Sequence, residues 1–396
     1  MENPADSSRA RTGLPFQSAK RLNIHISHFT FHFSRFTASP FTHPKIMKHG
    51  IASIEEVSAF DTLIDVRTPA EFAEDHLPGS INCPVLSNEQ RVEVGSLYKQ
   101  VSPFAAKKVG AAYVSENIAH HLRDTFCDRE KDWLPLVLCW RGGERSGAMT
   151  HILRRVGWNA HQLAGGYKAY RKQVLTRLEE LPATLRFIVV CGATGSGKSR
   201  ILQALAGQGK QVLDLEALAC HKGSVLGVLP DMPQPAQKMF ESQLLLAMQS
   251  FDPARPVFVE AESRKIGMLC LPDALLGAIR SSPCIRIEAG FQARVDFLLH
   301  DYDYFLTAPE WLNSRLATLK ELHGNETLAC WKNHADYGRW RELVSELLAQ
   351  HYDPLYQRSQ NRNFSGFSAP QCFSTDDLSP AGIDLLAQQI GELIPA

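Results

Sequence analysis

The feature that most constrains the fold is the stretch Gly-Ala-Thr-Gly-Ser-Gly-Lys-Ser at residues 192–199. It follows the apolar run 187–191 and precedes residues 199–207, whose apolar side chains recur at helical spacing. This is the phosphate-binding P-loop pattern, in which backbone N–H groups surround a phosphate and the lysine reaches its outer oxygens. We therefore predict a phosphate site. Its residues are Gly192, Gly195, Gly197, Lys198 and Ser199, the last of which can ligate Mg²⁺ if that ion is used.

Short apolar runs alternate with helical or turn segments in two series. The first series occupies residues 62–67, 134–140 and 160–166, and the second occupies 187–192, 210–216, 256–262 and 284–289. This alternation predicts an α/β fold with largely parallel sheets. A chain of 396 residues also exceeds the roughly 250–300 residues of one core, so two domains are expected. We place the first at 47–181 and the second at 182–396, with a helical part from about residue 293.

Residues 1–46 have a different character, because no acidic side chain occurs between Asp6 and Glu55. Such a segment can mimic an organellar transit peptide. We expect instead a disordered extension, or an upstream start codon with Met47 as the first residue, because the amphipathic periodicity is weak.

Composition narrows the classes of partner. No run of roughly 18 apolar residues exists, so we expect a soluble protein without a membrane partner. The 42 basic residues balance the 42 acidic ones, so an RNA partner would need a local basic surface. The nine cysteines include no C-x-x-C pair, so we expect no metal site and a reducing cytoplasm.

Cys139 ends an apolar run and is followed by Trp-Arg-Gly-Gly-Glu-Arg-Ser and a helical pattern in which Ser146 can act as the cap. Backbone N–H groups, a helix start and the charges of Arg141 and Arg145 would all favour the thiolate. Gly142 and Gly143 are expected because a side chain there would crowd the sulfur or forbid the backbone angles. A thiolate in such a loop can attack a donor sulfur or selenium and hold it as a persulfide or selenylsulfide. A buried structural cysteine is the weaker alternative.

This loop resembles the active loop of rhodanese-like domains, which transfer sulfur or selenium through the cysteine. Residues 63–82 resemble the rhodanese segment that carries Asp65, Arg67, Glu71 and His76, and residues 165–171 fit the family's last strand-to-helix turn. For Asp65 and Arg67 a structural ion pair is as plausible as a direct role.

Further segments resemble the tRNA 2-selenouridine synthase family. They are residues 88–100, which ordinary rhodaneses lack, and residues 214–227, 234–245, 260–267 and 351–356. Within them lie further candidate site residues, for several of which an ordinary structural or surface role remains open: Asp214, Glu216, His221, Glu260, Glu262 and Arg264.

The resemblance implies replacement of sulfur by selenium at C2 of the wobble 2-thiouridine of tRNA. It also implies selenophosphate as the selenium donor, a geranylated intermediate formed from geranyl diphosphate, and no tightly bound cofactor. Aromatic residues of the helical part could stack on anticodon bases, although core packing is the expected role for most of them. These residues are Trp311, Trp331, Tyr337 and Trp340.

Two other functions remain open at this stage. One is a thiosulfate-dependent sulfurtransferase fused to an ATP-dependent kinase. The other is a non-catalytic module in which a nucleotide bound to the P-loop switches partner binding. The intact Cys139 loop argues against the second, because a binding module does not need an activated thiol.

Overall fold

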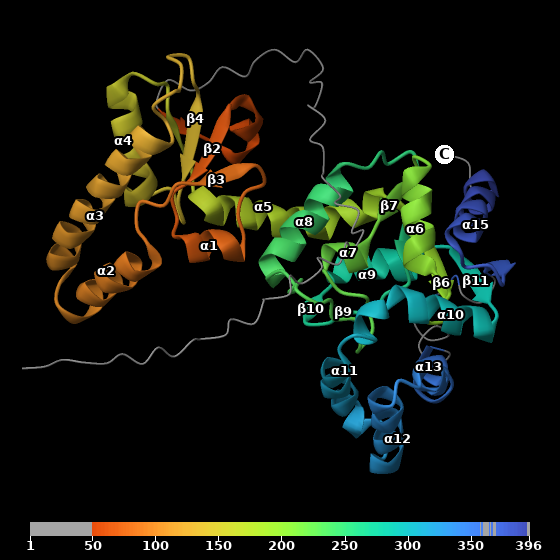
Figure 1. The fold of residues 1–396 in the computed structure, drawn as a ribbon. Helices are drawn as coiled ribbons and strands as arrows, with labels where there is room; N and C mark the ends of the chain where they lie inside the picture. Colours follow the sequence, from red (N-terminus) through yellow and green to blue (C-terminus); the bar gives the residue numbers. More distant parts are fainter. Residues whose placement is uncertain (1–49, 357, 359–363, 365, 367–369, 394–396) are drawn as a thin grey trace, which may run out of the picture. The chain divides into compact units, whose positions relative to one another are not determined.

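The computed structural model describes residues 50–356, 358, 364, 366 and 370–393. Residues 1–46, for which we expect an extension, lie outside the described residues. Residues 45–396 are grouped in one compact unit. Two five-stranded parallel sheets lie within it, and Figure 1 shows the elements in chain order.

The first sheet has the strand order β1-β5-β4-β2-β3. Its strands are β1 (Ile51–Ala52), β2 (Thr62–Asp65), β3 (Ser80–Asn82), β4 (Pro135–Leu138) and β5 (His161–Leu163). Its helices are α1 (Pro69–Glu74), α2 (Asn88–Gln100), α3 (Pro103–Asp124), α4 (Glu144–Val156) and α5 (Gly166–Glu180). All four residues of β4 are buried, which places this strand in the centre of the core.

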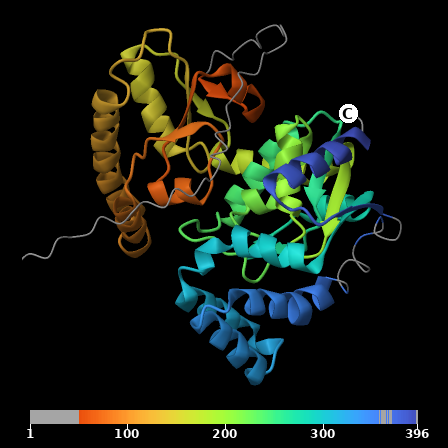
Figure 2. The same ribbon diagram turned by 45° about the vertical axis from the view of Figure 1, so that its right-hand side comes forward.

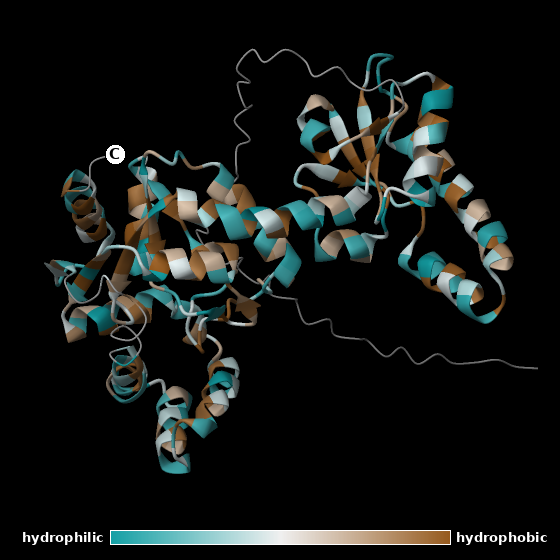
Figure 3. Ribbon diagram, turned by 180° about the vertical axis from the view of Figure 1, so that it is seen from behind, coloured by the Kyte–Doolittle hydropathy of each residue, from teal (hydrophilic) through white to brown (hydrophobic). Residues whose placement is uncertain are grey.

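The second sheet has the strand order β12-β11-β6-β8-β7. Its strands are β6 (Arg186–Gly192), β7 (Gln211–Leu213), β8 (Pro256–Glu260), β11 (Cys284–Ala289) and β12 (Gln371–Thr375). Its helices are α6 (Lys198–Gly207), α7 (Leu215–Leu218), α8 (Gln237–Gln249), α9 (Asp273–Arg280) and α15 (Pro380–Leu393), and β9 (Lys265–Ile266) pairs with β10 (Leu269–Cys270). In Figure 3 the strands of both sheets are largely hydrophobic. The parallel sheets predicted from the two series of apolar runs are thereby confirmed.

The helical region follows β11. It contains α10 (Phe291–Asp301), α11 (Pro309–Leu316), α12 (Asn325–Asp336) and α13 (Trp340–Leu347), and it ends in a π-helical turn at Leu348–Tyr352. The chain then returns to the second sheet through β12, which pairs with β11, and α15 packs against α6 (Figure 2). The helical region is therefore followed by the last strand and helix of the sheet domain.

Among the described residues, no helix is both long enough and apolar enough to cross a bilayer.

Candidate functional site

The thiol of Cys139 lies in the loop that joins β4 to α4. The side chain is 4 % exposed, and its loop leads directly into the first turn of α4. The loop is also held by the start of α5, where the N–H groups of Tyr167 and Lys168 donate hydrogen bonds to the carbonyls of Cys139 and Trp140. Two helix starts therefore fix the position of this loop.

Two donors reach the sulfur directly. The Ser146 hydroxyl is 3.1 Å from Cys139 Sγ, and the Gly143 N–H donates from 3.4 Å. Gln162 Nε2 donates to Ser146 Oγ at 2.8 Å, and the single hydroxyl proton of Ser146 can point at the sulfur or at the Gly143 carbonyl, 3.3 Å away. Burial alone would raise the pKa of Cys139, but hydrogen bonds from Ser146, Gly143 and the Arg141 N–H outweigh it and hold the pKa below its ordinary value.

The two arginines of the loop have different surroundings. Arg145 donates through Nη1 and Nη2 to the two carboxylate oxygens of Glu71, at 2.6 and 3.2 Å. Its charge is therefore matched by a carboxylate before any ligand binds. Arg141 is exposed, and no side-chain partner for it occurs among the described residues. The two arginines, for which the sequence predicted the same role, therefore differ in their partners, although the charge of Arg145 still interacts with Cys139.

The two loop glycines differ in the space around them. Gly142 has φ +66°, and a Cβ there would lie 2.5 Å from the carbonyl oxygen of Leu163. A Cβ at Gly143 would meet no atom within 4 Å. The prediction that a side chain at Gly143 would crowd the sulfur is therefore wrong. Gly143 is the N-cap residue of α4, the place the sequence assigned to Ser146.

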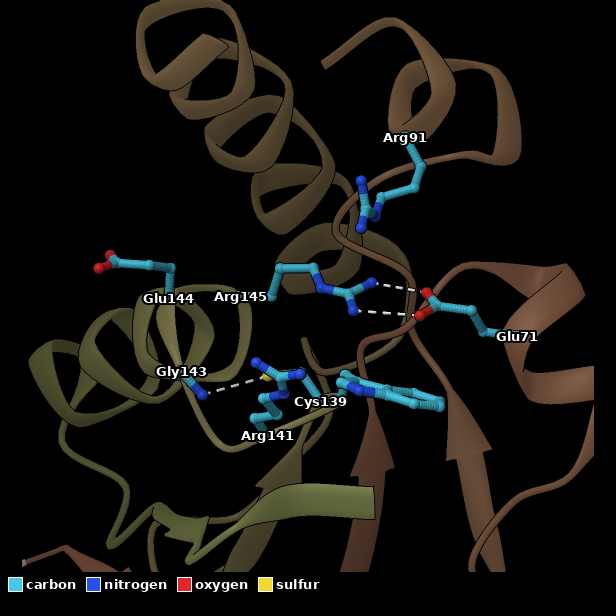
Figure 4. Close-up of a pocket in the computed structure, with 8 residues that line it drawn as sticks. Glu71, Arg91, Cys139, Arg141, Gly143, Glu144 and Arg145 are labelled. Atoms are coloured by element: carbon cyan, nitrogen blue, oxygen red, sulfur yellow. Dashed lines mark hydrogen bonds and ion pairs between the residues drawn. The ribbon is translucent and has the colours of Figure 1, made fainter. Parts of the chain in front are cut away.

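A cavity of about 520 Å³ opens over this loop. Eight residues line it: Glu71, Arg91, Cys139, Trp140, Arg141, Gly143, Glu144 and Arg145. Figure 4 shows Arg91 reaching in from the opposite side to the cysteine loop, while the carboxylate of Glu144 points away from the sulfur. Arg91, which belongs to α2, was not among the predicted site residues.

Asp65 and Arg67 form a structural pair rather than part of the cavity wall. They are 0 % and 1 % exposed, and Arg67 Nη2 lies 2.6 Å from Asp65 Oδ2. The same Nη2 donates to the carbonyl of Asp75 at 2.7 Å, and the guanidinium stacks on the ring of Tyr167, 3.9 Å from its centroid. This buried network joins β2 to the start of α5, which holds the cysteine loop.

The predicted phosphate loop lies between β6 and α6. Gly195 and Gly197 have φ of +83° and +77°, and a Cβ at Gly192 would lie 2.4 Å from Ser196 Oγ. Lys198 Nζ donates to the carbonyls of Gly192 and Ala193, at 2.8 and 3.3 Å. Burial lowers the pKa of Lys198, although nearby carboxylates oppose that shift. This loop therefore has the backbone shape and the cation that a bound phosphate requires.

Four carboxylates gather beside this loop: Asp214, Glu216, Glu260 and Glu262. Ser199 Oγ donates to Glu216 at 2.7 Å, and Glu260 accepts from the N–H of Leu215 at 3.1 Å. Burial raises the pKa of all four, and the pKa of Glu262 reaches about 8. Glu260 Oε1 is buried and makes no hydrogen bond to any of the residues that the structure describes. Hard oxygen donors around a serine hydroxyl suit Mg²⁺, so these residues fit that ion.

His221 and Arg264, the other two predicted residues of this domain, do not belong to the carboxylate group. His221 is 4 % exposed, and burial lowers its pKa. Its place in an isolated bridge with Val228 favours a structural role. Arg264 pairs with Asp273 at an exposed position, which is the surface role left open by the sequence.

The aromatic candidates of the helical region mostly pack in its core. Trp331 is fully buried and donates through Nε1 to Glu346 at 3.1 Å. Trp311 and Trp340 are partly buried against the same core, and Tyr337 is 74 % exposed. Tyr337 is therefore the most exposed of the four, and the guanidinium of Arg339 lies over its ring, 5.7 Å from the centroid.

Cys330, His334 and Glu346 bring three possible metal-ligand atoms within 4.8 Å of one another. The sequence predicted no metal site. His334 Nε2 and Trp331 Nε1 both hydrogen-bond to Glu346, so this group already forms a connected network between α12 and α13.

Three residues that sequence reasoning missed complete the thiol site. Ser146 was interpreted only as a helix cap, and Gln162 lies in β5, sixteen positions further along the chain. Arg91 lies in the segment 88–100, for which we noted a resemblance to the tRNA 2-selenouridine synthase family. That segment was the signal that could have identified Arg91.

Comparisons with known proteins agree with this two-site organisation. Residues 51–173 match the rhodanese-like domain family, and residues 185–312 match the "tRNA 2-selenouridine synthase AAA domain" family. Over 272 residues the chain is 36 % identical to a tRNA 2-selenouridine synthase of Nitrosomonas europaea, covering 66 % of this chain and 68 % of that protein. It is 32 % identical to the enzyme of the same name from Bdellovibrio bacteriovorus, covering 76 % of this chain and 89 % of the relative.

Replacing Ser146 with alanine should raise the pKa of Cys139, because the thiolate loses its closest donor. The pH dependence of Cys139 alkylation by iodoacetamide should shift to higher pH by about one unit. Arg145→Ala should shift it in the same direction but less, because Arg145 acts on the sulfur through its charge alone, whereas Ser146 donates a hydrogen bond to it. A larger shift for Arg145→Ala than for Ser146→Ala would contradict this assignment.

Glu262→Gln should flatten the pH dependence of stability in the protein without Mg²⁺ or phosphate. The folded-state pKa of Glu262 is raised from 4.5 to about 8, so its contribution to stability is complete below pH 4.5 and is lost as the pH rises through 8. Glutamine stays neutral throughout. Urea midpoints at pH 5 to 8 should therefore fall less for Glu262→Gln than for the wild type, with the exposed Glu179→Gln as control. Equal slopes for wild type and Glu262→Gln would refute the assignment.

Proposed function

Because the chain belongs to the tRNA 2-selenouridine synthase family, we propose that it converts the wobble 2-thiouridine of tRNA to 2-selenouridine through an S-geranyl intermediate. Geranyl diphosphate and selenophosphate are the small-molecule substrates in this proposal. The observation that carries it is the presence in one chain of a thiol site with a lowered pKa and of a separate phosphate loop. We place the reaction in the cytoplasm, with tRNA as its macromolecular substrate.

Geranylation is assigned to the second domain. The diphosphate of the donor would lie in the loop 192–199, where Lys198 and the backbone N–H groups compensate its charge. The thiouridine sulfur then attacks C1 of the geranyl group, so a C–S bond forms and diphosphate leaves. Phosphate binding of this kind does not require ATP hydrolysis.

A bound Mg²⁺ ion is compatible with the assignment of geranylation to the second domain. Four carboxylates next to a diphosphate would repel it, and a divalent cation held by Ser199, Glu216 and Glu260 would reverse that repulsion. When bound, the ion would stabilise negative charge on the leaving diphosphate. The chain's own contribution is to hold these oxygens together at the ends of β6, β7 and β8.

Selenation is assigned to Cys139, which delivers the selenium of selenophosphate to C2 without forming an S–Se bond, so the oxidation state of selenium does not change. S-alkylation makes the uridine sulfur a better leaving group and makes C2 more electrophilic. In the net exchange selenium bonds to C2 and geranylthiolate leaves. The Se–P bond of selenophosphate breaks, and water supplies the oxygen that turns its phosphorus into phosphate. Ser146 and Gly143 keep the sulfur of Cys139 anionic during this step.

Lys198→Ala should weaken binding of geranyl diphosphate by about tenfold to a hundredfold, because a charged hydrogen bond contributes about 1.5–3 kcal/mol. Geranylation of tRNA should fall, and tRNA that is already S-geranylated should restore selenation. Nucleoside mass spectrometry of both reactions measures this. Loss of selenation on the pre-geranylated tRNA, to the same degree as loss of geranylation, would show that the two domains do not divide the reaction.

Cys139→Ser should abolish selenation and leave geranylation intact, because a hydroxyl of similar size stays protonated near neutral pH. Geranylated tRNA should accumulate when geranyl diphosphate and selenophosphate are both supplied. Nucleoside mass spectrometry detects the geranylated nucleoside. Normal yields of 2-selenouridine from this variant would remove Cys139 from the mechanism.

A further inference from the structure

The cavity over Cys139 contains two guanidinium groups without a carboxylate partner among the described residues. Three arginines line it, and one of them, Arg145, is held by both oxygens of Glu71. Arg91 and Arg141 have no such ion pair, and the other acidic side chain of the wall, Glu144, points away from the sulfur (Figure 4). The remaining positive charge beside the thiol therefore comes from Arg91 and Arg141.

Arg91 is presented by a rigidly fixed helix start. The first turn of α2 is closed by a capping box, in which Ser87 and Gln90 exchange hydrogen bonds of 3.2 and 2.8 Å. Asn117 of α3 donates to Gln90 at 2.9 Å. Asn88 accepts from the N–H of Ala70 at 3.1 Å, next to Glu71 in α1. The backbone that carries Arg91 is thus attached to α1 and to α3, while its guanidinium remains free to bind a ligand.

We propose that Arg91, with Arg141, binds the tetrahedral oxyanion of the selenium donor and places its chalcogen atom at Cys139. The inference rests on the proposed function, in which the thiol acts on an anionic donor. A tetrahedral oxyanion such as a phosphate presents several oxygens, and an arginine fork matches two of them at once. Arg141 extends from the cysteine loop and Arg91 from the opposite wall, so such an anion would be held on two sides.

A role for Arg91 in packing is not supported by its surroundings. The side chain is exposed, and it takes part in no hydrogen bond, ion pair or ring contact among the described residues. An exposed arginine without partners contributes little to stability, so its replacement should leave folding intact. Lys99, an exposed cation two turns further along α2 and outside the cavity, offers a matched control.

The direct test measures anion binding without tRNA. In the full-length protein, inorganic phosphate should protect Cys139 from iodoacetamide, and Arg91→Ala should raise the half-protecting phosphate concentration about tenfold or more. Arg91→Lys should lie between the two because it keeps the charge and loses the fork. Lys99→Ala should behave as the wild type. Failure of phosphate to protect the wild type, or equal protection in Arg91→Ala at an unchanged melting temperature, would overturn the proposal.

Turnover gives a second readout. With selenophosphate and S-geranylated tRNA, Arg91→Ala should raise the KM for selenophosphate by a similar factor and leave kcat at saturating donor within about threefold, because only binding of the anion is lost. A fall in kcat with an unchanged KM would contradict a donor-binding role. Weaker binding of tRNA with unchanged phosphate protection would instead assign Arg91 to the RNA backbone and overturn the proposal.

The source of the anion is decided by a parallel titration with thiosulfate. If thiosulfate protects Cys139 at lower concentrations than phosphate does, and the protection depends on Arg91, the anion-binding role stands and the donor is a sulfur oxyanion. If selenophosphate in addition fails to modify S-geranylated tRNA, the donor in the proposed function fails while the role of Arg91 remains. If phosphate protects and tRNA still gains no selenium, the proposed reaction fails independently of this site.

Discussion

Both candidate sites depend on the same constraint, a turn at the end of a buried parallel strand that leaves no room for side chains. At Gly142 a Cβ would collide with a backbone carbonyl, and at Gly166 it would lie 2.2 Å from the carbonyl of Cys139. At Gly192 it would collide with Ser196. These close approaches let the backbone turn from strand to helix within a few residues, so that N–H groups face the space where an anion binds.

The two sites manage charge in different ways. At Cys139 a single negative charge is stabilised by neutral donors, Ser146 and Gly143, and the guanidinium of Arg145 is paired with Glu71. Beside Lys198 four carboxylates are crowded together, and burial disfavours their charged forms. The first site is thus ready for an anion, whereas the second requires cations as well. This difference is consistent with the division of labour that we propose between a chalcogen donor and a prenyl diphosphate.

The first domain also contains a buried polar network that supports the thiol without touching it. Asp65, Arg67, Asp75 and Tyr167 are linked by hydrogen bonds, and Tyr167 donates through its backbone N–H to the carbonyl of Cys139. Loss of one partner would leave an uncompensated buried charge, which is strongly destabilising. The network therefore connects β2, the end of α1 and the start of α5 to the loop that carries Cys139.

The sequence by itself determined the parallel α/β sheets, and it located the loop around Lys198 and the loop of Cys139 as candidate sites, because alternating apolar runs and glycine-rich turns are local patterns. It could not determine which polar groups meet the sulfur. Ser146 and Gln162 come together across two elements, Arg145 is neutralised by a glutamate 74 positions earlier, and Arg91 enters from a separate helix. Only tertiary structure decides such pairings, because hydrogen bonds and charges act over a few ångströms in space and leave no fixed spacing along the chain.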